Sequence, residues 1–284
     1  MIRHFVATLF AGTMLLNGQW YDAVNELSAR ANHATLVTEN KTLGLVLDNL
    51  AVDSAITWWG YKHWEWGSSH LHMANEKWFE YDSPTGGSDK SGHFYMTYML
   101  SRVLSSRMED RGLDLKSASL YGSLSALFSM TLLEVGDGSS EKYGFSKKDL
   151  IADTLGALTA YWIRSHPRVD DFLDVRMEYA PTSGYLTNGD STTDYSGMRH
   201  LVAFQLSGFK SLKKSPLRFL ELQTGFYSRG YRPYDTMPRS QHVYFGIGFS
   251  LHEGAKKLKV NPLKNLFEFY QPGHTYIEGD IWHR

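Results

Sequence analysis

The stretch that decides the fold is Leu173-Asp174-Val175-Arg176-Met177-Glu178-Tyr179, in which apolar and charged residues alternate. Successive side chains on a β-strand point to opposite faces, so this period of two predicts a strand with one apolar face. Three later segments alternate in the same way and are separated by turn-forming residues: 200–209, 217–227 and 243–251. The chain beyond 172 therefore predicts an antiparallel meander of about four long strands.

The chain before Pro167 has a different period. Apolar residues recur at spacings of three and four, which predicts helices over 21–36, 43–59, 93–107, 118–133 and 148–164. An N-terminal helical bundle that packs with a C-terminal meander is an α+β fold. Four strands cannot close a barrel alone. The alternatives are therefore an association of several chains, or a partial barrel whose other strands resemble helices in the sequence.

The domain organisation follows from these periods. Residues 1–20 are a secretory signal or an apolar N-terminal helix, since an uncharged run over 5–16 follows the basic Arg3. The helical part covers 21–166, the strands cover 167–252, and an irregular tail with a short helix near 262–270 covers 253–284. The apolar run over 42–59 is interrupted by Asp48 and Asp53, which predicts an amphipathic or interfacial helix.

The composition excludes several classes of protein. The net charge is −1, from 29 Lys+Arg and 30 Asp+Glu, so there is no basic field that would gather nucleic acid. The absence of cysteine excludes disulfides, thiolate metal sites and a Cys nucleophile. Aromatic residues make up 14% of the chain, which suits half-wet surfaces such as membrane interfaces. We expect a membrane or envelope lipid as partner. The sequence leaves open whether the protein forms a homo-oligomer.

Five of the eight Trp lie between Trp58 and Trp78. This stretch predicts either a membrane-interface belt, or a sugar-binding platform, or a core between helices with amphipathic edges.

Candidate catalytic residues lie at three predicted helix ends. Asp89 stands four residues before His93, so both can share one helix face, and a carboxylate beside an imidazole suits a general base or a metal ligand. Glu134 and Asp137 end a second helix, and Ser146 and Asp149 resemble the capping box that opens a third.

These helix ends, together with Asp153, could converge on one polar pocket inside the bundle. The residue types suit hydrolysis, group transfer or a divalent cation, and they equally suit a buried structural network. We predict no cofactor.

These motifs resemble a known family. Over about 40–255 the chain is similar to the YfiM-like family of predicted periplasmic lipoproteins, a domain of unknown function. The similarity rests on three runs in this order: Ser88-Asp89-Lys90-Ser91-Gly92-His93-Phe94, Glu134-Val135-Gly136-Asp137-Gly138 and Tyr143-Gly144-Phe145-Ser146-x-x-Asp149. A more distant likeness is to VanZ-like membrane proteins. Asp153 stands at the position where those proteins usually have Asn. The resemblance implies a Gram-negative envelope location, but no cysteine is present to carry a lipid.

Two functional hypotheses follow. The first is an uncharacterised, non-catalytic cell-envelope protein that is periplasmic and associated with the outer membrane. The second is an envelope hydrolase or transferase that acts on lipid or glycan, with His93 as base and Asp89 as its orienting partner. In this second hypothesis Glu134, Asp137 and Asp149 serve as acid or cation ligands.

Overall fold

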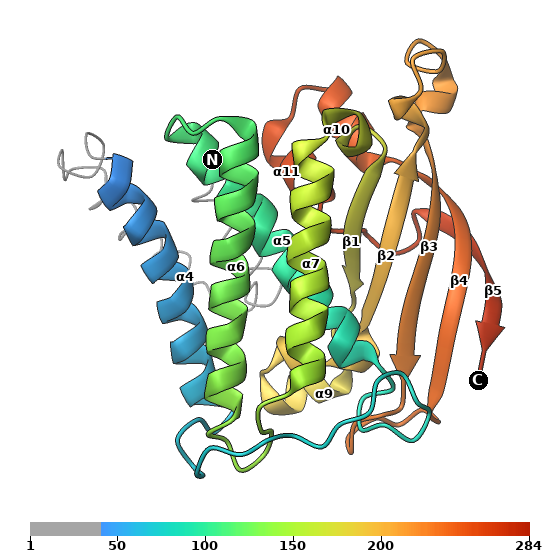
Figure 1. Ribbon diagram of the computed structural model, residues 1–284. Coiled ribbons are helices and arrows are strands. Elements are labelled where there is room, and N and C mark those ends of the chain that lie inside the picture. Colours follow the sequence, from blue (N-terminus) through green and yellow to red (C-terminus); the bar gives the residue numbers. More distant parts are fainter. Residues whose placement is uncertain (1–40) are drawn as a thin grey trace.

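The computed structural model describes residues 41–284 (Figure 1), and the predicted segment 1–20 and predicted helix 21–36 lie outside them. Four long helices form the first part: α4 (Lys41–His63), α5 (Ser88–Asp110), α6 (Leu115–Asp137) and α7 (Lys147–Ser165). They coincide with the last four predicted helices. The periodicity of the apolar residues is a reliable guide here because these residues gather on one side of a helix, whether that side is buried or exposed.

The starts of the helices follow from capping residues. The Asp114 side chain accepts hydrogen bonds from the first turn of α6, and the Ser146 hydroxyl accepts one from the Asp149 amide at 3.2 Å at the start of α7. Such caps satisfy amides that have no partner within the helix. Gly156 then allows α7 to approach α5 closely, because a Cβ there would lie 2.3 Å from the Phe94 carbonyl oxygen.

The second part of the chain is an antiparallel sheet in the order β1-β2-β3-β4-β5, which confirms the predicted α+β fold and meander. The strands are β1 (Leu173–Tyr179), β2 (Met198–Gln205), β3 (Leu220–Arg229), β4 (Ser240–Phe249) and β5 (Tyr276–His283). Short helices accompany them: α8 (Pro167–Asp170) precedes β1, α9 (Ser183–Asn188) lies between β1 and β2, and α10 (Leu251–Lys257) and α11 (Asn261–Phe267) lie between β4 and β5.

The prediction of an irregular tail over 253–284 is wrong for the last strand. Residues 276–283 form β5 at the edge of the sheet, and α10 and α11 precede it. Just before β5, the Gln271 amide donates to the Met177 carbonyl at 3.0 Å, and the Met177 amide donates to the Phe269 carbonyl at 2.9 Å. The tail therefore reaches both edges of the sheet by backbone pairing, and its Phe269 is buried in the core beside Tyr98.

The helices and the sheet share one hydrophobic core. In Figure 1, α5 lies behind α6 and α7, and it contacts both of these helices and the first three strands. Its residues Tyr95, Tyr98 and Val103 pack with Ile163 of α7 and Val175 of β1. The start of α5 is thereby held between the other helices and the sheet.

The sheet carries a buried polar layer on the face opposite Val175. The Arg176 guanidinium binds Asp174 at 2.5 Å, Glu221 at 2.9 Å and the side-chain oxygen of Gln271 at 2.8 Å. A buried arginine needs such partners, since an unpaired charge in the interior is costly.

The Trp-rich stretch serves mainly as core. Trp59, Trp64 and Trp66 are buried and pack with Met130 and Leu133 of α6. Trp58 keeps 39% of its surface exposed. For the buried Trp residues the structure supports the helix-core interpretation of the stretch.

Candidate functional site

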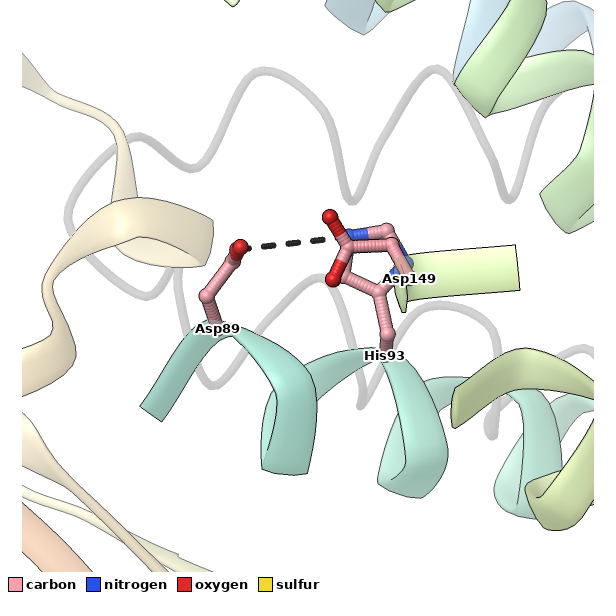
Figure 2. Close-up of side chains that lie close together, drawn as sticks. All are labelled: Asp89, His93 and Asp149. Carbon is pink, nitrogen blue, oxygen red and sulfur yellow. Dashed lines mark ion pairs between the residues drawn. The ribbon is translucent and has the colours of Figure 1, made fainter. Parts of the chain in front are cut away.

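The candidate residues meet at one end of the helical bundle. This is where α5 begins, α6 ends and α7 begins, because the three helices run alternately up and down (Figure 1). Figure 2 shows Asp89 and His93 projecting from the same side of α5 toward Asp149 of α7. The structure thus brings the predicted residues together, as the spacing of the motifs suggests.

His93 lies at the centre of the cluster, and its two ring nitrogens have different surroundings. Nδ1 lies 3.2 Å from Asp153 Oδ1 and 3.6 Å from Glu134 Oε1. Nε2 lies 4.0 Å from Asp89 Oδ1 and has no hydrogen bond to any residue between 41 and 284. One nitrogen is therefore held, and the other is available to a further group.

Asp153 is the carboxylate that orients the imidazole. It is fully buried, and Oδ1 also accepts a hydrogen bond from the Thr97 hydroxyl at 2.7 Å. The sequence predicts this role for Asp89, which shares the helix face with His93 but lies beyond hydrogen-bonding distance of the ring. The opposing helix supplies the closer partner because Gly156, one turn beyond Asp153, lets α7 pack tightly against α5.

Lys90 joins the carboxylates on the Nε2 side. Its buried ammonium lies 2.9 Å from Asp89 and 2.7 Å from Asp149, and it also forms an ion pair with Glu76. The Tyr195 hydroxyl donates to Asp89 at 2.5 Å. These contacts fix Asp89 and Asp149 opposite Nε2.

Glu134 is buried, Asp137 is partly buried, and both are held by groups outside α6. The Ser146 amide donates to Glu134 Oε2 at 2.9 Å, and the indole of Trp66 donates to Asp137 Oδ1 at 2.7 Å. Asp137 therefore borders the cluster rather than contacting the imidazole directly.

Negative charge exceeds positive charge in this space. Burial raises the pKa of Glu134 to about 9 and that of Asp137 to about 7. Burial and then the charge of Asp89 raise the pKa of Asp149 to about 7. A buried carboxyl group resists ionisation where no cation offsets the loss of water.

The pKa of His93 moves in the direction opposite to that expected from burial. Burial lowers it, but the negative charges of Asp153 and Asp149 outweigh burial and raise the pKa well above its ordinary value. Burial raises the pKa of Asp89, but Lys90 and His93 outweigh this and lower it. The imidazole is therefore protonated near neutral pH, beside an ionised Asp89.

Two sets of residues have ligand atoms close enough to hold a cation. The first set is Asp89, His93 and Asp149, and the second set is His93, Glu134 and Asp153. Within each set the ligand atoms lie within 4.8 Å of one another. Both sets offer the oxygen and nitrogen ligands that divalent metals accept.

Sequence reasoning assigns no role to several members of the cluster. Lys90 stands inside the motif that carries Asp89 and His93, and its position directly after Asp89 is the signal that could have found it. Tyr195 lies between β1 and β2, outside the three motifs from which the sequence predicts the site. Glu76 has no local signal, since it enters the site from the loop between α4 and α5.

Comparison with known proteins shows a similarity to one family over part of the chain. Residues 75–165 match the family described as predicted periplasmic lipoprotein (DUF2279). This confirms the predicted resemblance to such a family, over a shorter segment than 40–255, and it supports a periplasmic location. The match contains Glu76 and all the candidate residues of α5, α6 and α7, but not Tyr195. No curated protein and no solved structure matches the chain.

Proposed function

We propose that this protein is a cell-envelope hydrolase or transferase that acts on an envelope lipid or glycan and uses His93 as a proton donor. One observation carries the proposal: buried Asp153 holds Nδ1 at 3.2 Å, while Nε2 faces Asp89 and Asp149 without a hydrogen bond to any described residue. A carboxylate that orients one ring nitrogen leaves the other correctly placed for proton transfer.

The direction of proton transfer follows from the charges. The raised pKa keeps the imidazole protonated near neutral pH, so His93 serves as an acid rather than as the base expected from the sequence. His93 keeps 13% of its side-chain surface exposed, and Asp89 keeps 15%. A substrate can therefore approach from the Asp89 side.

Asp149 is the group best suited to accept a proton. Its pKa of about 7 leaves a substantial ionised fraction near neutral pH, and a ligand atom of Asp149 lies within 4.8 Å of one of His93. In the proposed step, the attacking hydroxyl, of water or of an acceptor, loses its proton to Asp149 and its oxygen bonds to the electrophilic centre. The bond to the leaving oxygen breaks, and that oxygen takes the Nε2 proton of His93.

A second candidate is the non-catalytic protein associated with the outer membrane. The hydrogen bonds of the network favour it, because Lys90, Glu134, Asp137 and Asp153 all have hydrogen-bonding partners. Such a network can serve structure alone where its members satisfy one another.

Product formation distinguishes the two candidates. The full chain is incubated with phospholipid and peptidoglycan from a Gram-negative envelope, and mass spectrometry follows the products. We expect products from the unmodified protein and from His166→Gln, whose ring is exposed at the end of α7, but not from a folded His93→Gln variant.

Three results would overturn the proposal. Absence of products from the unmodified protein favours the non-catalytic role. Equal yields from His93→Gln show that His93 is not the proton donor. Loss of products after treatment with a chelator assigns the carboxylates to a divalent cation instead of to direct proton transfer.

A further inference from the structure

An apolar stripe runs along the outer surface of α7. Ile151, Leu155, Leu158 and Trp162 are spaced by three and four residues, and each has about half of its surface exposed, between 48% and 57%. The charged residues of the same turns face the interior, since Asp149 and Asp153 are buried in the site. A helix that faces water has the opposite arrangement.

A matching stripe lies on α6, which packs beside α7. Its members are 41% to 65% exposed: Leu120, Tyr121, Leu124, Phe128 and Val135. No charged residue occurs between 117 and 133. Among the described residues α6 is also the one helix long and apolar enough for a membrane span, with half of that stretch buried in the protein. We call the two stripes together the helical apolar face.

The adjacent helix α4 shows the same inversion. The Asp48 carboxylate turns inward to Arg107 at 3.1 Å and to Arg111 at 2.8 Å. Val46 and Leu50, by contrast, are about half exposed. The charge that interrupts this apolar run in the sequence is therefore paired within the protein, so it does not oppose contact between α4 and an apolar phase.

One end of the helical apolar face is basic. Lys142, Lys147 and Lys148 lie in or beside the turn between α6 and α7, near the exposed acid Glu141. The ammonium of Lys148 also donates to the Glu76 carbonyl. Lysine side chains at the rim of an apolar surface can reach lipid phosphates while their methylene groups stay in the apolar phase. The stripe on α6 extends about 22 Å from Leu120 to Val135, at 1.5 Å per residue.

We propose that the helical apolar face rests on a phospholipid bilayer, with α6 and α7 parallel to the membrane plane. Its apolar side chains lie among the upper parts of the acyl chains, and the basic end contacts anionic head groups. In-plane binding fits a single apolar face whose opposite side packs on α5, because an in-plane helix buries one face only about 5–10 Å deep. This inference is independent of the proposed catalysis.

The absence of cysteine allows a direct test with single labels. Nitroxides are attached to Leu120→Cys, Leu124→Cys, Val135→Cys and Leu155→Cys in the full chain, with liposomes of phosphatidylethanolamine and phosphatidylglycerol. Each site is an exposed position, so the substitution leaves no cavity in the core. We expect the labels to collide with oxygen, to lose collisions with a water-soluble nickel complex, and to lie at similar shallow depths along α6.

A label at Lys213→Cys, in the exposed loop between β2 and β3, is the matched control and should stay accessible to nickel. Nickel access at the helical sites equal to that at the control would overturn the proposal. Shielding from both reagents would show that protein covers the face, either residues 1–40 or a second copy. A profile deepest at Leu124 and shallow at both ends of α6 would show a membrane span instead.

Discussion

Replacing Asp153 by asparagine should weaken the hold of His93 on its proton. The Nδ1 hydrogen bond to Asp153 is 3.2 Å long, and Asn retains the shape and the acceptor for Thr97 while removing the charge. A hydrogen bond to a charged group contributes about 1.5–3 kcal/mol. At about 1.4 kcal/mol per unit, the pKa of His93 should fall by about one to two units.

Side-chain ¹⁵N NMR across a pH titration measures this change directly. The resonances of His93 are identified by their loss in His93→Gln. Asp170→Asn is the control, because Asp170 binds Arg102 and not His93. If the titration midpoint of His93 is unchanged in Asp153→Asn, or shifts equally in Asp170→Asn, then Asp153 does not hold the protonated ring.

Two further predictions concern stability. The Glu134 carboxyl, with its pKa raised from 4.5 to about 9, stays protonated in the folded state while the unfolded state ionises, so stability should fall as pH rises from about 5 to 9. Glu134→Gln should lack this part of the slope, and urea unfolding at pH 5 and at pH 8.5 measures the difference; parallel slopes in both proteins would contradict it. Gly156→Ala should cost about 1–3 kcal/mol, because its Cβ meets the Phe94 carbonyl oxygen at 2.3 Å. Gly92→Ala has no atom within 4 Å of its Cβ and should gain about 0.5–1 kcal/mol, and equal melting temperatures for the two variants would refute the close helix contact.

The helices and the first four strands could be predicted from sequence because apolar residues repeat on one face of each. In β1 that face is buried, since Leu173, Val175 and Met177 contribute to or pack against the core under α5. In α7 and β4 it is exposed, as at Leu155 and Ile247, and the repeat is equally clear. β5 carries a weaker repeat, because Gly279 and His283 share the face of Ile277 and Ile281, and its backbone pairs with β4.

The candidate site shows the same division. Asp89 and His93 are four residues apart, so the repeat of a single helix places them close together. Contacts of Asp153 and Glu76 with this helix depend on how α7 and a long loop pack, which no local spacing encodes. The raised pKa of His93 also depends on packing, since it follows from the charges that packing gathers around the ring.

The central claim is that protonated His93, held by Asp153, supplies a proton in the reaction. The most direct test is the pH dependence of product formation in the unmodified protein and in Asp153→Asn. We predict that the rate falls as pH rises through the pKa of His93 found by NMR, and that Asp153→Asn moves this fall to lower pH by the same shift. A fall at the same pH in both proteins would contradict the claim.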